Sequence, residues 1–498
     1  MITMIINRLK ETINYNKSMF IIACTITLFQ LYSLHDCFID DAYIVLSYAK
    51  NFLPNIHWGL TKYEFSNTAT SPLNVVLLAI IGYPFNDYEL AAVIVAFLSI
   101  IFIFHLMGEI AVFYGLKRYF VFPFFSLFLF NPFILSTIGL ETIPLLSFIL
   151  FSIFLYLQKR FLILGSLLGI LYLFRPDTLL FSISILIYIY YCTVVKLKEL
   201  TFKTFFKKLF LPFSIVLFIA VIVEWWLLGS LFPLTFFLKF NQKWPDDVSY
   251  LGGLLLYLKK LRIETLISFI PLMGYFIYII LSRIKYSPIL KYILIISLLT
   301  YACYSLLNVP PYHWYYVPII FMAILFVFFF FITAIKAEKI ILNKSLFIVL
   351  TLLPLVLYMY FPVIEKSFIL NEAPIHTNWA KKIDYEKISK ELNVIFENDV
   401  TISVNGEIGT INYFSKIHLD NVFGNQKFGQ EIKDKMKEHN FLYEILGVIN
   451  FYWYPSTKLS SQGSCLFISS TKPLALERFS RYWYFKTKWR ESFHYLIN

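Results

Sequence analysis

Charged residues are scarce in this chain of 498 residues. Asp, Glu, Lys and Arg together make up 15% of it, whereas soluble globular proteins contain about 25%. Hydrophobic residues account for 59% and aromatic residues for 20%. This balance excludes an ordinary soluble domain and favours a protein that spans a membrane.

Paired cysteines and a signal-peptide cleavage site are also missing. The N-terminus is basic and then apolar, but no small-residue cleavage site follows Ile21–Leu34. We therefore expect this first apolar segment to be an uncleaved membrane span. The cysteines lie at spacings that match neither a zinc site nor a disulfide framework; they are Cys24, Cys37, Cys192, Cys303 and Cys465.

Apolar residues are concentrated in blocks that are long enough to cross a bilayer. Blocks of about 17–25 residues with almost no charge, such as Leu209–Leu228 and Ile319–Ile335, match a hydrocarbon core of ~30 Å at ~1.5 Å per residue. The sequence thus predicts a polytopic α-helical membrane domain over residues 1–364, with about eleven transmembrane helices. The predicted spans are Ser18–Leu34, Glu89–Tyr114, Tyr119–Thr137, Thr142–Leu157, Phe161–Phe174, Thr178–Val195, Leu209–Leu228, Thr265–Ser282, Ile289–Leu307, Tyr315–Ile335 and Ser345–Val363.

Basic residues fall in alternate connecting segments. Six successive basic segments lie on one side of the predicted membrane, which makes that side cytoplasmic by the positive-inside rule. The N-terminus is then inside, the C-terminus outside, and the net charge of +12 reflects topology and not a nucleic-acid surface. We expect a multi-pass protein of the bacterial cytoplasmic (inner) membrane. The basic residues are Arg8, Lys10, Lys17, Lys117, Arg118, Lys159, Arg160, Lys196, Lys198, Lys203, Lys207, Lys208, Arg283, Lys285, Lys336, Lys339 and Lys344.

Residues 365–498 have a different composition and are predicted to form a small periplasmic α/β domain. This part has no apolar run of membrane length. From Gly406 to Gly409 it reads Gly-Glu-Ile-Gly, without the lysine of a phosphate loop, so we interpret it as a tight strand-to-helix turn. Strands are predicted at Val400–Val404, Ile417–Leu419 and Ser464–Ser469, and helices at Trp379–Leu392 and Gln430–Leu446.

The first predicted outer loop, residues 35–88, carries the clearest chemical signal. Asp40 and Asp41 stand side by side at the start of a segment whose apolar residues recur at helical spacing. Aspartates in this position commonly cap a helix and suit its dipole. A carboxylate at a membrane surface can also act as a general base, so both interpretations stay open. The apolar piece Asn74–Gly82 that follows is too short to span.

Further motifs follow in order in the other predicted outer segments. Together they resemble the C-superfamily (GT-C) of integral membrane glycosyltransferases, in particular its arabinofuranosyltransferase-like branch. The chain departs from that pattern at Asn67–Ala69 and at Leu234, which leaves the sugar open. The motifs are Asp40 to Tyr43, Tyr48 to Asn51, Thr70 to Leu73, Gly139 to Thr142, Arg175 to Asp177, Phe232 to Lys239, and Gly406 to Asp420.

The resemblance implies an inverting sugar transfer at the outer face of the membrane. A polyprenyl phosphate presents the sugar, an acceptor hydroxyl on an envelope glycan, lipid or protein attacks the anomeric carbon, and the lipid phosphate leaves. The attacking hydroxyl loses a proton, so a positioned carboxylate is useful. The leaving phosphate gains negative charge, so cations or hydrogen-bond donors should face it. The catalytic candidates are Asp40, Asp41 and Glu141, and the candidates for binding donor phosphate or substrate are Arg175, Lys239, His313 and Tyr43.

Each candidate outside the Asp pair also has an ordinary structural interpretation. Glu141 lies beside the end of a span, where solvated carboxylates are common, and Arg175 can simply pair with Asp177 across a proline. Lys239 can be a snorkelling anchor. His313 lies in an aromatic stretch that is typical of an interfacial belt.

Two other function classes stay open from the sequence. A transporter or flippase of lipid-linked sugars needs ionisable residues near the middle of its spans, and the predicted spans are nearly free of charge. A membrane-anchored envelope assembly protein would use the bundle only as an anchor. The expected partners are a polyprenyl-phosphate sugar donor, a glycan or lipid acceptor and membrane lipids. The only cofactor that we consider is a divalent cation at Asp40 and Asp41.

Overall fold

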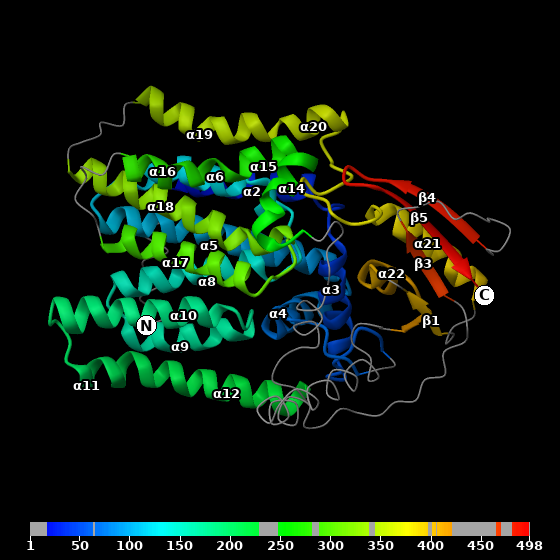
Figure 1. Ribbon diagram of the computed structural model, residues 1–498, viewed down its shortest axis with the longest axis horizontal. Helices are drawn as coiled ribbons and strands as arrows, with labels where there is room; N and C mark the ends of the chain where they lie inside the picture. The colour runs from blue at the N-terminus through cyan, green and yellow to red at the C-terminus, as the bar shows by residue number, and fades with distance from the viewer. Residues whose placement is uncertain are drawn as a thin grey trace.

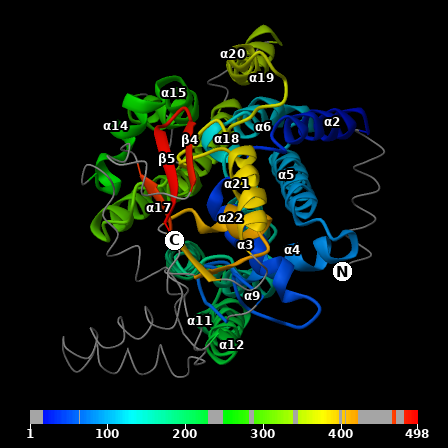
Figure 2. The same ribbon diagram turned by 90° about the vertical axis from the view of Figure 1, so that its right-hand side faces the viewer.

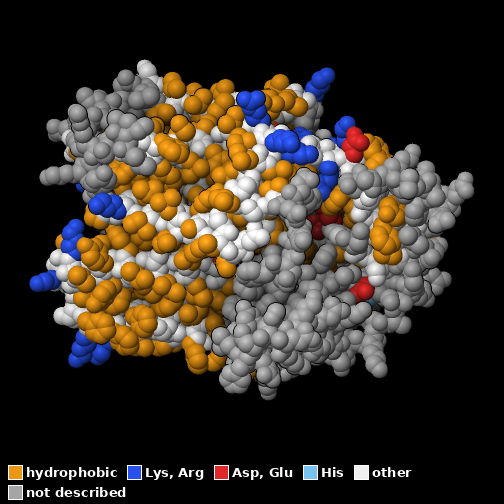
Figure 3. All heavy atoms as spheres, in the orientation of Figure 1, with side chains coloured by type: hydrophobic (Ala, Val, Ile, Leu, Met, Phe, Trp, Pro, Cys, Tyr) orange, Lys and Arg blue, Asp and Glu red, His pale blue; other side chains and the backbone are white. Residues whose placement is uncertain are grey.

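The protein is a bundle of apolar helices with a small sheet domain at one end (Figure 1). A computed structural model describes residues 17–62, 65–228, 248–280, 288–337, 344–396, 401–404, 406–420, 465–469 and 481–497. We call the end of the bundle that carries the sheet the domain end, and the opposite end the basic end. Figure 3 shows a largely hydrophobic bundle surface, with Lys and Arg side chains at the basic end and also near the domain end.

The bundle is that of a multi-pass membrane protein. Among the described residues, six helical segments are long and apolar enough to cross a bilayer. They are Tyr88–Phe113, Thr178–Lys196, Phe202–Leu228, Pro288–Leu306, His313–Lys336 and Phe347–Ile364. Shorter apolar helices cover most of the remaining predicted spans, so the polytopic helical fold is confirmed and the number eleven stays a prediction.

The helices of the bundle follow the apolar blocks of the sequence closely. Those before residue 200 are α2 (Lys17–Ser33), α3 (Asp40–Phe52), α4 (Pro72–Gly82), η1 (Tyr83–Phe85), α5 (Tyr88–Phe113), η2 (Arg118–Val121), α6 (Phe122–Leu129), α7 (Pro132–Leu135), α8 (Thr142–Leu157), α9 (Phe161–Ile170), η3 (Leu171–Leu173), α10 (Thr178–Ile189) and the π-helical η4 (Tyr190–Lys196). Those after it are α11 (Phe202–Phe205), the π-helical η5 (Phe206–Phe210), α12 (Leu211–Leu228), α14 (Tyr250–Lys260), α15 (Arg262–Phe269), η7 (Ile270–Leu272), α16 (Met273–Ile280), α17 (Pro288–Leu306), η8 (His313–Tyr315), α18 (Val317–Lys336), α19 (Lys344–Tyr358) and α20 (Tyr360–Glu365).

Two predicted spans are interrupted in the structure. The segment predicted as Tyr119–Thr137 divides into η2, α6 and α7. The break falls at Asn131, whose side-chain oxygen accepts hydrogen bonds from the amides of Phe133 (3.1 Å) and Ile134 (3.3 Å) and so starts a new helix before Pro132. The segment predicted from Thr265 divides at η7, which contains Pro271.

The described part of the C-terminal domain contains a five-stranded mixed sheet and two helices. The strand order is β2-β1-β3-β5-β4; β1 is parallel to β2 and β3, and β5 is antiparallel to β3 and β4. The first three strands confirm the predicted positions, whereas β4 and β5 were not predicted, and the helix predicted at Gln430–Leu446 lies outside the described residues. The elements are α21 (Lys382–Ile395), β1 (Thr401–Val404), α22 (Ile408–Phe414), β2 (His418–Asp420), β3 (Cys465–Ser469), β4 (Arg481–Lys486) and β5 (Glu491–Ile497).

The domain is seated on the first predicted outer loop. In the view of Figure 2, α21 and α22 lie over α3, which crosses the domain end of the bundle. Gly409 permits this close approach, since a Cβ there would lie 2.2 Å from the Asp40 carbonyl oxygen and 2.8 Å from the Ile44 amide nitrogen. The glycine-containing turn predicted between strand and helix is thus present, and its second glycine serves the contact between domain and bundle.

The contact at Gly409 gives a direct test of how the domain is held. We expect Gly409→Ala to lower the free energy of unfolding by ~1–3 kcal/mol, because backbone atoms of α3 must shift to admit the methyl group. Gly406→Ala is the matched control, as a Cβ at Gly406 has no neighbour within 4 Å. Thermal unfolding and limited proteolysis of the junction measure the difference; equal behaviour of the two variants would contradict tight seating of α22 on α3.

Candidate functional site

The predicted helix after residue 39 begins at Asp40, but Asp40 does not cap it. The N-cap position of α3 is Ile39, and no side chain caps this helix. The Asp40 carboxylate instead reaches the start of α22. It accepts hydrogen bonds from the amides of Gly409 (3.2 Å) and Thr410 (2.7 Å) and from the Thr410 hydroxyl (2.9 Å). Asp40 therefore serves as a cap for a helix of the other domain, about 370 residues later in the chain.

Burial dominates the electrostatics at this junction. Only 5% of Asp40 is exposed, and burial raises the pKa of its carboxyl group to about 6, although the hydrogen bonds from Thr410 and Gly409 oppose this shift. Burial also raises the pKa of Glu407 well above its usual value, and the nearby Asp40 adds to the effect. Glu407 accepts hydrogen bonds from the Trp379 amide (2.8 Å) and the Tyr385 hydroxyl.

Asp41 occupies a different side of α3 from Asp40. Successive residues of a helix are turned by about 100°, so the Asp41 side chain leaves α3 in a different direction from that of Asp40. Asp41 is half-buried. The next residue, Ala42, packs on the second predicted outer loop, where a Cβ on Gly139 would lie 2.8 Å from the Ala42 Cβ. Asp40 therefore binds the C-terminal domain, and Asp41 occupies another face of the same helix.

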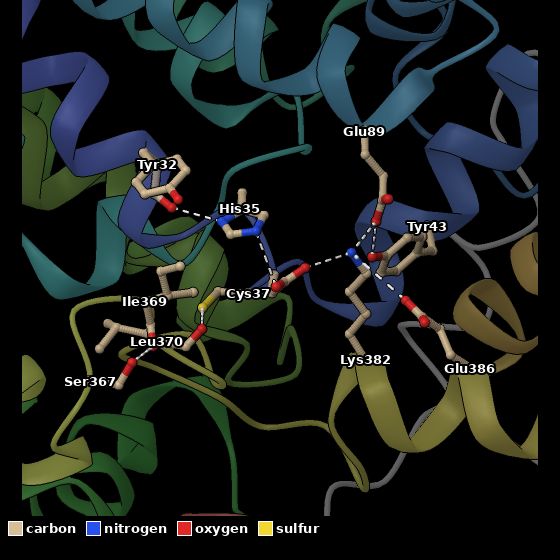
Figure 4. Close-up of polar contacts among 11 residues, drawn as sticks. Tyr32, His35, Cys37, Tyr43, Glu89, Ser367, Ile369, Leu370, Lys382 and Glu386 are labelled. Atoms are coloured by element: carbon tan, nitrogen blue, oxygen red, sulfur yellow. Dashed lines mark hydrogen bonds and ion pairs between the residues drawn. The ribbon is translucent and has the colours of Figure 1, made fainter.

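A second polar cluster holds the domain to α5 and to the start of the first loop (Figure 4). The Lys382 ammonium of α21 lies 2.8 Å from Asp36, 3.0 Å from Glu89 and 3.8 Å from Glu386. Burial alone would lower the pKa of Lys382, but the carboxylates of Asp36 and Glu89 outweigh it and raise this pKa. Tyr43 belongs to the same cluster, since its buried hydroxyl donates a hydrogen bond to Glu89.

Two further candidates, Glu141 and Arg175, come together at the domain end of the bundle. The Arg175 guanidinium makes a bidentate contact with Asp177, with Nη2–Oδ2 at 2.6 Å and Nε–Oδ1 at 3.1 Å. Its Nε lies 3.7 Å from Glu141. Tyr304 donates a hydrogen bond to Asp177, and the Tyr315 ring lies 5.0 Å from the guanidinium carbon. The predicted pairing of Arg175 with Asp177 is present, and it joins a larger cluster.

One donor of this cluster has no hydrogen-bond partner among the described residues. Arg175 is 5% exposed, and within this part of the chain its Nη1 atom is buried without a hydrogen bond. A narrow cavity of about 40 Å³ adjoins it, between α8, α10, α17 and α18, and apolar side chains such as Phe181 and Met322 form much of its wall. A buried guanidinium donor without a partner is costly, so this atom is suited to an anionic ligand.

The remaining candidates lie elsewhere. His313 is fully buried, and its Nε2 lies 3.1 Å from the Ser136 carbonyl oxygen, so at this position it supports the second predicted outer loop. The Ser136 hydroxyl in turn accepts a hydrogen bond from the Ile375 amide (2.8 Å). Lys239 and the Phe232 motif lie outside the described residues.

Several residues of the site were not found from the sequence. Lys382 and Thr410 contact the first loop from positions more than 340 residues away, and no local spacing indicates such contacts. Tyr304 lies within an apolar span, where a tyrosine is expected as a belt residue. Glu407, in contrast, is part of the glycine-flanked motif that the sequence had already singled out.

Comparison with known proteins finds a likeness in fold among solved structures. No family model and no curated protein matches the sequence. The fold is similar to that of ArnT from Cupriavidus metallidurans, whose crystal structure contains undecaprenyl phosphate. The TM-score is 0.56 at 10% sequence identity, over 96% of this chain and 97% of that chain. The chain therefore has an ArnT-like membrane fold with a C-terminal sheet domain. Membership of the GT-C superfamily and of its arabinofuranosyltransferase-like branch stays a prediction.

The shifted pKa of Asp40 predicts a pH-dependent junction. Because the pKa rises from 3.8 to about 6 in the folded protein, the folded state binds this proton more tightly than the unfolded chain. The stability that Asp40 contributes is therefore full below pH 3.8 and is lost as the pH rises through about 6.

We expect the free energy of unfolding of the wild type, relative to Asp40→Asn, to fall by up to about 3 kcal/mol between about pH 4 and pH 7. Thermal unfolding of both proteins in detergent at several pH values measures this difference. A difference that stays constant over this range would contradict a buried, titrating Asp40.

Proposed function

We propose that the protein transfers a sugar from a polyprenyl-phosphate donor to a glycan, lipid or protein acceptor at the outer face of the bacterial cytoplasmic membrane. The fold supports this, because the similar ArnT structure holds undecaprenyl phosphate. The observation that carries the proposal is the contact of Arg175 with Glu141 (3.7 Å) at the domain end of an apolar bundle. Gly139, two residues before Glu141, lies against Ala42, the residue after Asp41. In the proposed orientation, this end and the C-terminal domain are periplasmic, and the basic end is cytoplasmic.

In the proposed mechanism, Asp41 is the general base. The acceptor hydroxyl attacks the anomeric carbon as its proton passes to the Asp41 carboxylate, a bond from the acceptor oxygen to this carbon forms, and the bond from the carbon to the phosphate oxygen breaks. The products are the glycoside, with inverted configuration, and the free polyprenyl phosphate. Asp40 positions the base, because three donors of α22 hold its carboxylate and thus fix the first turn of α3.

Arg175 is proposed to bind the donor phosphate through Nη1. The Asp177 and Glu141 carboxylates hold the other side of the guanidinium in one orientation, so little ordering is needed when a ligand binds. The apolar side chains beside Arg175 provide a surface for the hydrocarbon chain of the lipid carrier. Glu141 then acts as a positioning residue for Arg175, and Tyr43 and His313 support the loops instead of touching the substrate.

The geometry of the Asp pair bears on the divalent cation. The Asp40 oxygens already accept three hydrogen bonds from α22, which makes them less available to a cation. We therefore propose a transfer in which protein groups supply the base and the phosphate contacts. If a chelator abolished the activity and a divalent cation restored it, the transfer would depend on a metal ion and this proposal would be contradicted.

Asp41→Asn tests the proposed base. We expect turnover to fall by about 10²- to 10⁴-fold, because an amide cannot accept the proton, while thermal stability changes little. The measurement is transfer of radiolabelled sugar from a lipid-linked donor by purified protein. Glu199→Gln is the matched control, since this carboxylate pairs with Lys159 at the basic end. Turnover of Asp41→Asn within threefold of the wild type would exclude Asp41 as the base.

Arg175→Lys tests the proposed phosphate contact. The lysine keeps the positive charge but loses the planar donor at Nη1, so we expect kcat/KM for the lipid donor to fall by about 10- to 100-fold. Arg118→Lys is the matched control, because Arg118 is also partly buried and pairs with Glu109 (2.5 Å) near the basic end. Equal losses in both variants would indicate a general packing effect instead of a phosphate site.

The rival functions make different predictions in the same preparation. A flippase moves lipid between leaflets and yields no glycosidic product in detergent, whereas the proposed enzyme does. An assembly protein gives neither product nor protection, whereas binding of the sugar donor to the enzyme should protect the first loop, residues 35–88, from proteolysis.

A further inference from the structure

A second cavity, of about 410 Å³, lies at the basic end of the bundle. Its walls come from α10 and the π-helical η4 on one side and from α17 on the other. The site around Arg175 lies at the far end of α10. From Asp177 to Lys196 the helical rise amounts to roughly 28 Å, so the lysine end of this cavity and Arg175 are nearly one bilayer core apart. Among the described residues, the two cavities meet only at Ile296, and the charged end of this one is remote from the proposed catalytic site.

The cavity has an apolar and aromatic wall that opens sideways from the bundle. The rings of Tyr188 and Tyr292 stack at 4.5 Å between centroids and form part of its inner surface. At its open side, Ile187 is 63% exposed and Ile295 is 54% exposed. Both lie in segments that are long and apolar enough to span the bilayer, so this opening faces lipid chains and not water.

Two lysines give one end of the cavity a positive charge. Lys196 and Lys291 both line it, and no carboxylate occurs among the described residues that line it. The nearest carboxylate in sequence, Glu199, is bound to Lys159 at 2.8 Å. Lys196 ends a π-helical stretch, a rare backbone form that is frequent at functional sites.

We propose that this cavity binds one anionic phospholipid of the leaflet at the basic end. Its phosphate lies between Lys196 and Lys291, and an acyl chain follows the apolar wall past Tyr188 and Ile295. Basic pockets between transmembrane helices recognise anionic head groups in this way, and the apolar opening requires a ligand with a hydrocarbon chain. This site goes beyond the proposed sugar transfer, and it stands whether or not that transfer occurs.

Native mass spectrometry of the full-length protein in detergent tests the site. Phosphatidylglycerol is titrated in, with phosphatidylcholine as the neutral lipid and inorganic phosphate as the soluble anion. We expect the wild type to retain one phosphatidylglycerol, and Lys196→Gln/Lys291→Gln to bind it about thirtyfold more weakly, at roughly fivefold per lysine. Lys203→Gln/Lys207→Gln removes the same charge in α11 and η5, outside the cavity, and should retain the lipid.

A cavity-filling variant tests the contribution of the apolar wall separately from that of the two lysines. Ile295→Trp keeps both lysines but occupies the space of the acyl chain, so it should also lower retention. Equal loss in the two double-lysine variants would overturn the proposal, because it indicates diffuse surface attraction. Displacement of the lipid by inorganic phosphate, retention of phosphatidylcholine as strong as that of phosphatidylglycerol, or retention of polyprenyl phosphate alone would each overturn it as well.

Discussion

The rest of the structure depends on the seating of the Asp40 carboxylate on the first amides of α22. This contact joins a loop near the N-terminus to a domain at the C-terminus, and it excludes water from both partners. A buried carboxylate is stable only when it is well hydrogen-bonded or protonated. Asp40 meets both conditions. Its carboxylate accepts three hydrogen bonds, and its raised pKa means that it takes up a proton more readily than a free aspartate. The close approach at Gly409 and the ion cluster around Lys382 then fix α3 on two sides.

This seating explains why two neighbouring aspartates have different roles in the proposed enzyme. Neighbours on a helix point in directions about 100° apart, so one side chain can face the domain while the other faces the bundle. A base must be held within a fraction of an ångström of its productive position. A helix that is clamped by Asp40 and by the Tyr43–Glu89 contact provides such a support. In the proposed enzyme, the C-terminal domain therefore contributes to the site by holding α3.

The sequence alone predicted the bundle well and the site only in part. Apolar blocks identify spans such as α5 and α8 because the bilayer demands length and low charge. The pairing of Arg175 with Asp177 was also readable, since the residues are two apart. The contacts of Asp40 with Thr410 and of Lys382 with Asp36 were not, because they join segments far apart in the chain. Strands β4 and β5 carry aromatic residues at Tyr482 to Phe485 and Phe493 to Tyr495, a composition that is typical of strands.

The most direct test of the central claim is a structure of the protein with a non-cleavable polyprenyl phosphonate sugar bound. We expect the phosphonate within hydrogen-bond distance of the Arg175 Nη1 atom, about 2.7–3.2 Å, and the anomeric carbon facing Asp41. Asp40 should remain on the amides of α22 in that complex. A phosphonate bound at the basic end, or an anomeric carbon remote from Asp41, would contradict the proposed site.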